Sequence, residues 1–273
     1  GSAVLGLGNI GVEGPFPVME GKAMIFKELA NIDAFPIVLD TQDVDEIVKT
    51  IKHIAPVFGA INLEDISAPR CFEIEKRLQE KLNIFVFHDD QHATAIVVLA
   101  GLINAFKVVK KNLKKSRVVL IGAGAAGSAT TQLLVSFGVK NILVVDKAGI
   151  LSKNNKNLVA HQRELAEITN KDAKEGNLEQ ALVGADAVIG LSAPGIIKPA
   201  YIKKLAKNPF VFALANPVPD IMPDIAKIAG AFIVGMERCD YRVADYDFKA
   251  YSFLKENLEH TKVFYNNSLV NVH

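Results

Sequence analysis

The sequence is poor in cysteine, with only Cys71 and Cys239 among its 273 residues. Two isolated thiols lack the ligand spacing of a metal site, and they fit a protein kept in a reducing compartment. A basic excess is also missing, because 31 lysines and arginines balance 30 aspartates and glutamates. Proteins that bind nucleic acid or anionic membranes usually carry such an excess, so we expect neither partner.

Long apolar runs, repeats and low-complexity tracts are missing as well. No apolar run approaches the roughly 18 residues typical of a membrane-spanning helix, and no segment reads as a signal peptide. We therefore expect a soluble, cytoplasmic protein. The chain begins "GSAVLGLGNIG" without a Met, which leads us to expect a fragment of a longer chain.

Apolar runs instead alternate with helix-like segments along the whole chain. In the first half we expect strands at 3–8, 34–40, 60–65 and 84–90, with helices near 19–30, 43–54 and 70–82. An apolar helix over 91–111 would lead to a second half with strands at 116–121, 141–146, 185–195, 210–217 and 231–236. Strands separated by helices indicate parallel pairing through right-handed crossovers.

This order predicts an α/β fold in which a smaller α/β catalytic domain precedes a Rossmann-type, doubly wound parallel sheet. We expect three parts. Residues 1–100 would bind metal and substrate, residues 101–241 would bind a dinucleotide, and residues 242–273 would form a tail that packs on the first domain. The tail is polar, charged and aromatic, with a helix expected near 248–259.

A glycine-rich segment follows the strand expected at 116–121 and precedes a helical pattern. The residues that we expect to bind the cofactor there are Gly122, Gly124, Ala125, Ala126 and Gly127. Such glycines allow a tight turn, close approach of the backbone to a pyrophosphate, and close packing of helix on strand. The alternative is an ordinary glycine turn.

Asp146 ends the next expected strand. A carboxylate at this position can accept hydrogen bonds from both adenosine ribose hydroxyls and would repel a 2′-phosphate. We therefore expect NAD rather than NADP. The alternative is an aspartate that only caps a turn at the strand end.

Two further loops follow strands at the edge of the sheet where ligands bind. They read "SAPG" from Ser192 to Gly195 and "ANPVPD" over 215–220. Ser192 and Asn216 are our candidates for nucleotide and substrate contacts. The competing interpretation is that proline and glycine only terminate the strands.

Four carboxylates occur at the ends of two neighbouring expected strands: Glu64 and Asp65, then Asp89 and Asp90. Parallel strands would bring them into one cleft, where a divalent cation relieves their repulsion. Oxygen ligands suit Mg²⁺ or Mn²⁺. Alternatively, Asp89 or Asp90 caps the following helix and the other pair is solvated.

One lysine and two histidines are further candidates for roles beside the acidic residues. Lys22 lies near the start of the apolar helix pattern over 17–30, where burial would lower the pKa of its amine into the range of a general base. A solvated surface lysine is the ordinary alternative. His88 and His92 flank the acid pair, and we expect them to be hydrogen-bonding neighbours rather than metal ligands.

In combination these segments resemble the malic enzymes, in particular the small-subunit microbial type without its N-terminal segment. The matching motifs are "GSAVLGLGNIG", "PVMEGKA", "FPIVLDTQD", "INLEDISAPRCFEIE", "FHDDQHATAIV", "GAGAAG" and "FALANPVPD". The match runs from Gly1 to about Tyr241. The resemblance implies oxidation and decarboxylation of L-malate to pyruvate with NAD or NADP and a divalent metal.

Carried over by motif, the resemblance assigns roles to individual residues. The implied metal ligands are Glu64, Asp65 and Asp90; the base is Lys22, with Asp89 as its partner. Asn216 would contact malate. Asn267, within "YNNSLVNVH", would be a second asparagine contact after an insertion of about 20 residues relative to the family pattern.

The chain departs from the family pattern in three places. The tyrosine acid of the family lies upstream of the segment with which this chain starts. The family's "GRSDYPNQINN" corresponds only to "GMERCDYRVADY", and "HAT" over 92–94 replaces the usual "HGT". These departures leave a non-catalytic nucleotide-binding or assembly remnant open as a rival function. A malolactic enzyme is a second rival, because the sequence does not separate it from a malic enzyme. We also expect a homodimer or a larger homo-oligomer.

Overall fold

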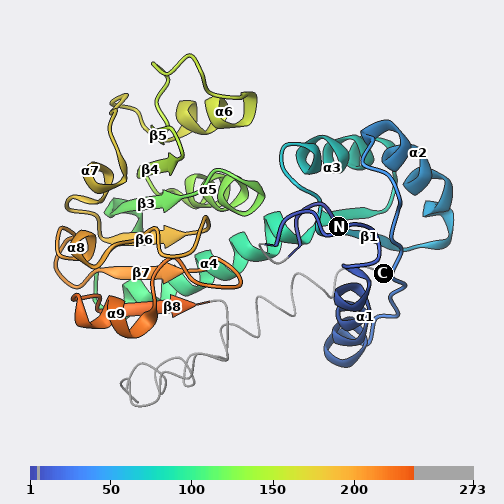
Figure 1. Ribbon diagram of the computed structural model, residues 1–273, viewed down its shortest axis with the longest axis horizontal. Helices are drawn as coiled ribbons and strands as arrows, with labels where there is room; N and C mark the ends of the chain where they lie inside the picture. The colour runs from blue at the N-terminus through green and yellow to red at the C-terminus, as the bar shows by residue number, and fades with distance from the viewer. Residues whose placement is uncertain (5–6, 237–273) are drawn as a thin grey trace.

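The computed structural model describes residues 1–4 and 7–236, and it contains two sheets of unequal size connected by one long helix (Figure 1). The smaller part contains α1 Phe16–Ala30, α2 Val44–Ile54, η1 Ala55–Val57, β1 Ala60–Leu63, α3 Arg70–Lys81 and β2 Phe85–His88. The connecting helix is α4 Asp89–Val108, followed by η2 Leu113–Lys115. The strands of the larger part are β3 Arg117–Ile121, β4 Asn141–Asp146, β5 Gly149–Ile150, β6 Ala187–Gly190, β7 Phe210–Ala213 and β8 Ile233–Met236. Its helices are α5 Ala125–Phe137, α6 Ala160–Ile168, α7 Leu178–Leu182, α8 Pro199–Ile202 and α9 Pro223–Ile228.

The larger sheet has the strand order β5-β4-β3-β6-β7-β8, and its strands are parallel except for the edge strand β5. The order reverses between β3 and β6, which is the switch point where ligands bind in such sheets. Ile121 pairs with Gly190, and Gly190 pairs with Ala213. The segments after β3, β6 and β7 therefore leave from one edge. The predicted fold class, a Rossmann-type sheet preceded by a smaller α/β part, is confirmed.

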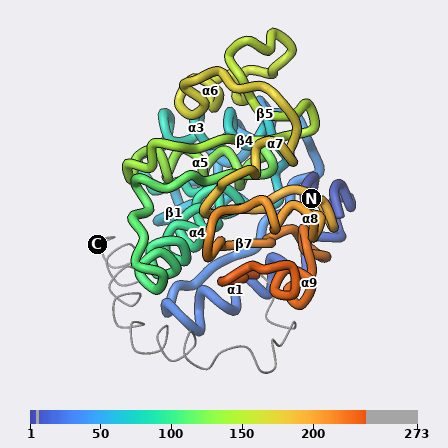
Figure 2. Tube along the Cα trace, turned by 90° about the vertical axis from the view of Figure 1, so that its left-hand side faces the viewer, coloured from blue at the N-terminus to red at the C-terminus, as the bar shows by residue number. Residues whose placement is uncertain are grey.

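The central strands are apolar because helices cover both faces of the sheet. In β3, "RVVLI", four consecutive residues from Val118 to Ile121 are buried. Figure 2 shows α4 and α5 on one side of the strands and α7, α8 and α9 on the other. Two separate buried clusters correspond to these two faces.

Helix α4 spans the boundary that we expected at residues 100–101, so this division of the chain stays a prediction. By length and composition alone, α4 is the one helix within the described residues that could cross a membrane. In the structure Leu102 and Phe106 are instead buried in the core of the larger part. Gly101 lies so close to β7 that a Cβ there would be 3.1 Å from the Phe212 ring.

The smaller part has its own core between its two-stranded sheet and helices α2 and α3. The Asp43 side chain caps α2 by accepting a hydrogen bond from the Glu46 N–H. One face of α2 is buried against α3, and the buried residues of this core include Ile47, Val48, Ile51, Ile74 and Leu78.

Two strand predictions in this part are wrong. Residues 3, 4, 7 and 8 are not in a strand, because the N–H groups of Ser2 and Ala3 donate to the Asp65 carbonyl and Val4 turns back to Gly8. Residues 34–40 also pair with no strand in the described part of the chain. Pro36 cannot donate to a ladder, which accounts for part of this failure. The helix expected at 248–259 and the rest of the tail lie outside the described residues.

Candidate active site

The parallel pairing of β1 and β2 builds the acidic cluster. Leu63 lies opposite His88, so the next residues on each strand, Glu64–Asp65 and Asp89–Asp90, emerge at the same edge. This is the juxtaposition that the sequence predicted from two neighbouring strand ends. Asp89 and Asp90 form the first turn of α4, and neither caps it, since the N-cap is His88 and no side chain bonds there.

Burial and mutual repulsion raise the pKa values of three of these carboxyl groups. Burial, then Asp89, raises the pKa of Glu64 to about 7. Burial, then Glu64, raises the pKa of Asp65 to about 6. Burial also raises the pKa of Asp90 to about 6, although a hydrogen bond from the Asp65 N–H opposes this. Carboxylates held together in this way are stabilised by a cation.

Asp65 has an unusual backbone and an unsatisfied side chain. Its φ of 59° lies in the left-handed region, which few non-glycine residues adopt. Its N–H donates to Asp90 Oδ2 at 2.8 Å. Asp65 Oδ2 is buried and has no hydrogen-bond partner among the described residues. A buried acceptor without a donor is costly unless something absent from the chain, such as an ion, satisfies it.

The metal assignment of Glu64, Asp65 and Asp90 fits by donor chemistry and by this unsatisfied oxygen. Within the described residues, however, no three His, Cys, Asp or Glu side chains already form an arrangement that could hold a metal. Lys22 lies in this cluster, with its Nζ 3.0 Å from Glu64 Oε1. The ammonium supplies positive charge in the cluster and occupies one of the two Glu64 carboxylate oxygens.

Lys22 also contacts Asp89, its predicted partner, with Nζ 3.0 Å from Oδ2. The Lys22 side chain, carried by α1, is only 25% exposed. Burial lowers its pKa, but Asp89 and Glu64 together raise the value above that of a free lysine. The expectation that burial prepares a neutral amine is therefore not met, because two carboxylates outweigh burial.

Glu75 of α3 is a residue that the sequence analysis missed. Its buried carboxylate accepts from the His88 N–H at 2.9 Å and from Gln91 Nε2 at 3.0 Å, and it bonds His92 Nε2 at 2.8 Å. It thereby holds the junction of β2 and α4 that carries Asp89. A lone glutamate in an amphipathic helix gives no sequence signal for such a role.

The two histidines differ from each other. His92 is the hydrogen-bonding neighbour that we predicted. His88 is completely buried, and neither ring nitrogen has a hydrogen-bond partner within the described part of the chain. Its Nε2 comes no closer than 3.5 Å to Asp90 Oδ2. Burial lowers the pKa of His88 to about 4, so the ring is neutral near pH 7.

The glycine segment after β3 has three distinct constraints. Gly122 has a φ of 104°, and a Cβ there would lie 2.6 Å from the Leu191 carbonyl oxygen. A Cβ on Gly127 would lie 1.9 Å from the Gly122 carbonyl oxygen. Gly124, the N-cap of α5, has no atom within 4 Å of such a Cβ. Gly122 and Gly127 thus serve the turn and the packing, while Gly124 and the following Ala125 and Ala126 leave the helix N-terminus open.

Asp146 lies at the end of β4 and touches this segment. Its Oδ2 accepts from the Ala123 N–H at 3.3 Å and from Gln162 Nε2 at 3.0 Å, while Oδ1 accepts from the Lys147 N–H at 2.7 Å. The turn contact that we weighed as an alternative is therefore present. The ribose contact stays a prediction.

Ser192 follows β6 and Asn216 follows β7, at the same edge as the glycine segment. Ser192 is exposed, and Asn216 is half-buried. Between these loops lies a second residue that sequence reasoning missed, the fully buried Asp220. Asn267, the other predicted malate contact, lies outside the described residues.

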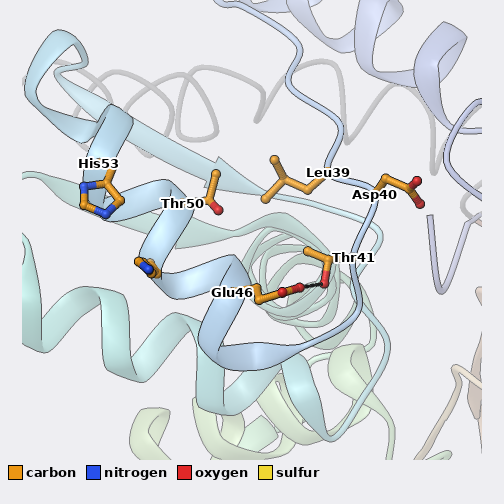
Figure 3. Close-up of a pocket in the computed structure, with 7 residues that line it drawn as sticks. Leu39, Asp40, Thr41, Glu46, Thr50 and His53 are labelled. Carbon is orange, nitrogen blue, oxygen red and sulfur yellow. Dashed lines mark hydrogen bonds between the residues drawn. The ribbon is translucent and has the colours of Figure 1, made fainter.

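A surface hollow of about 440 Å³ lies elsewhere, between α2 and the segment that precedes it (Figure 3). Its lining residues are Leu39, Asp40, Thr41, Glu46, Lys49, Thr50 and His53. None of them is a predicted site residue. We place the candidate site at the acidic cluster, because the carboxyl groups with raised pKa values and the unsatisfied Asp65 Oδ2 are there.

Comparison with known families gives two matches that together cover most of the chain. The model described as "Malic enzyme, N-terminal domain" matches residues 1–79, and "Malic enzyme, NAD binding domain" matches residues 92–228. The NAD-dependent malic enzyme of Geobacillus stearothermophilus is 57% identical over 227 residues, which are 83% of this chain and 48% of that protein. The bifunctional malic/malolactic enzyme of Bacillus subtilis is 51% identical over 242 residues, 88% of this chain and 59% of that protein.

A solved structure agrees with these relatives. The crystal structure of the NAD-dependent malic enzyme from Thermotoga maritima superposes with a TM-score of 0.85 at 52% identity, covering 88% of this chain and 64% of that chain. The chain spans about half the length of the curated relatives that it matches.

Proposed function

We propose that this chain, which belongs to the malic enzyme family, carries out the metal-dependent oxidative decarboxylation of L-malate to pyruvate and CO₂ with NAD(P). The observation that carries this proposal is the contact of Lys22 with both Glu64 and Asp89 at 3.0 Å, beside Asp65 and Asp90. The proposed base and the proposed oxygen ligands thus lie side by side, which supports the proposal.

The chain's own groups have separable tasks. Glu64, Asp65 and Asp90 would hold the divalent cation, and the segment from Gly122 to Gly127 would hold the dinucleotide. When bound, the cation supplies positive charge at the substrate oxygen and the nicotinamide supplies the hydride acceptor. Lys22 takes the hydroxyl proton of malate once its amine is neutral, and Asp89 orients that amine through its hydrogen bond.

The balance of the reaction follows from these tasks. Lys22 would take the hydroxyl proton of malate, and the dinucleotide held by the glycine segment would supply the acceptor for the hydride on the same carbon. Loss of CO₂ would break the bond between the distal carboxylate and its carbon and leave the electron pair on that carbon. A proton from solvent would complete pyruvate there, and Lys22 would return its proton to solvent. Asn216, at the same edge of the sheet as the glycine segment, is proposed to contact malate.

The test is reduction of NAD or NADP by the full chain with L-malate, followed by absorbance, in the presence of Mn²⁺ and after chelation. We expect reduced cofactor and pyruvate only with metal. A chain that binds NAD but never reduces it in the presence of malate and Mn²⁺ would support the non-catalytic alternative.

A malolactic reaction is the second candidate, because the Bacillus subtilis relative is named as a bifunctional malic/malolactic enzyme. The products separate the two. Pyruvate with net reduced cofactor supports the first proposal, whereas lactate without net reduced cofactor supports the second.

We propose NAD as the preferred cofactor. Asp146, at the end of β4, is the supporting feature, since its carboxylate lies next to the glycine segment and would repel a 2′-phosphate. The comparison of kcat/KM for NAD and NADP tests this. We expect a ratio of about tenfold or more in favour of NAD, a difference of about 1.4 kcal/mol.

We also propose that the chain works as a homodimer or a larger homo-oligomer. The supporting feature is α1, in which no residue is buried although the helix is rich in apolar side chains. Phe16, Met24, Ile25 and Leu29 are all exposed on it. Light scattering on the purified chain tests the proposal, and a monomer at all concentrations would contradict it.

A further inference from the structure

Asp220 joins the loop after β6 to the loop after β7. It ends the segment after β7, and it is completely buried. Its Oδ2 accepts from the Ala215 N–H at 2.9 Å, within its own loop. Its Oδ1 accepts from the Ser192 N–H at 3.4 Å, in the loop after β6.

The surrounding backbone is built to receive this carboxyl group. A Cβ on Gly190, the last residue of β6, would lie 2.3 Å from Asp220 Cγ, so only glycine leaves room for it. Two more backbone bonds join the same loops: the Gly195 N–H donates to the Pro219 carbonyl, and the Ile197 N–H donates to the Asp220 carbonyl. Asp220 therefore holds the ends of β6 and β7 in one arrangement.

The position of these loops indicates which part of a dinucleotide they face. Dinucleotides bind across the point where the strand order reverses, here between β3 and β6. The glycine segment and Asp146 lie on the β3–β4 side, which is the adenosine side. The loops after β6 and β7 lie on the other side, where the nicotinamide half belongs.

We propose that Asp220 is a positioning residue that holds the Ser192 and Asn216 loops in place for the nicotinamide half of the cofactor. This inference rests on the proposed function, and it extends that function to a residue that does not itself touch the cofactor.

The test compares affinities for NAD and ADP-ribose, measured by calorimetry on the full chain with Asp220→Asn. Asparagine keeps the shape but has one acceptor oxygen instead of two, so one backbone N–H loses its partner. We expect NAD affinity to fall about tenfold or more, while ADP-ribose affinity stays within about twofold because its contacts lie on the β3–β4 side. Asp224→Asn, an exposed change on nearby α9, is the matched control and should alter neither affinity.

Gly190→Ala is a second variant, since its methyl group displaces the Asp220 carboxyl group without changing it chemically. It should reproduce the selective loss of NAD affinity. Equal losses for NAD and ADP-ribose, or no loss for either, would overturn the positioning role. A wild-type chain that binds neither molecule would overturn the proposed function itself, and the two failures are thus distinguishable.

Discussion

At the residue scale, Lys22 carries the strongest chemical prediction. Lys22→Ala removes the proposed base, and kcat should fall by roughly 10²–10⁴, the usual contribution of a positioned acid or base. NAD affinity should not change, because the glycine segment is in the larger part of the molecule. Steady-state kinetics and a fluorescence titration with NAD provide the two readouts.

Lys27→Ala is the matched control for Lys22→Ala. Lys27 lies on the same helix, is 56% exposed and pairs only with the exposed Asp33 among the ion pairs of the described residues. Its loss should leave kcat near the wild-type value. Near-normal kcat in Lys22→Ala would place the base elsewhere, and parallel losses of kcat and NAD affinity would indicate a structural role.

Cys71, which is not one of the proposed site residues, leads to a prediction about how stability depends on pH. Burial raises the pKa of this fully buried thiol to about 12, above its ordinary value of 9.0. The unfolded chain releases this proton at a lower pH than the folded chain does. The contribution of Cys71 to the free energy of unfolding is therefore fully present below pH 9, and it is lost as the pH rises from 9 towards 12.

Urea unfolding of the wild type and Cys71→Ala at pH 8 and pH 10.5 checks this prediction. The stability advantage of the wild type should shrink at the higher pH, by at most about 1.4 kcal/mol per pH unit. Lysine and tyrosine titrations are common to both proteins and cancel in the difference. A difference that is the same at both pH values would contradict the shifted pKa.

At the element scale, two glycines at the junction of β3 and α5 have different roles: Gly127 serves packing, and Gly124 is proposed to serve cofactor binding. Gly127→Ala places a Cβ 1.9 Å from the Gly122 carbonyl oxygen, so α5 must move away from β3. We expect a loss of about 1–3 kcal/mol in the free energy of unfolding. Gly124→Ala meets no atom within 4 Å, and its φ of −78° suits alanine, so stability should change by less than about 0.5 kcal/mol.

For NAD affinity we expect the reverse: Gly124→Ala, which leaves stability unchanged, should weaken NAD binding directly. The methyl group of Gly124→Ala occupies the open approach to the N-terminus of α5, where we propose that the pyrophosphate of the cofactor binds. NAD affinity should fall about tenfold or more while the melting temperature is kept. If Gly124→Ala binds NAD as the wild type does, the pyrophosphate does not approach this helix end.

Sequence reasoning succeeded for elements whose pattern is independent of their partners. Buried parallel strands such as β3 and β7 are continuous apolar runs, because both faces are covered. It failed for 3–8 and 34–40, which are also apolar. A strand exists only when a neighbour supplies hydrogen bonds, and local composition does not reveal whether that neighbour is present.

At the scale of the whole molecule, the acidic cluster predicts a link between metal binding and stability. Mn²⁺ that binds the folded chain alone stabilises it by RT ln(1 + [Mn²⁺]/Kd), about 2.7 kcal/mol at 100 times Kd. The melting temperature of the wild type should therefore rise with Mn²⁺, and Asp90→Asn should lose this rise. Differential scanning fluorimetry measures both.

Without metal, Asp90→Asn should be at least as stable as the wild type. Burial raises the pKa of Asp90, so its charge is unfavourable in the folded chain, and asparagine still offers an oxygen to the Asp65 N–H. Glu80→Gln, an exposed change on α3, is the control and should keep the full response to Mn²⁺. An unchanged response in Asp90→Asn would remove Asp90 from the ligand set.

The sequence by itself determined the order of the five parallel strands in the larger part, the glycine turn and the meeting of Glu64–Asp65 with Asp89–Asp90. Each follows from a local rule. Runs of apolar residues mark the strands, glycine spacing marks the turn, and the carboxyl ends of parallel strands share one edge. The tertiary structure alone decided the neighbours of Glu75 and Asp220 and the contact of Lys22 with Glu64, whereas the pairing of Lys22 with Asp89 was expected from the family resemblance. Lys22 meets a carboxylate 67 residues away, and Ser192 lies 28 residues before Asp220. Single charged residues read as surface residues in a sequence, because burial and hydrogen bonding depend on chain segments that only folding brings together.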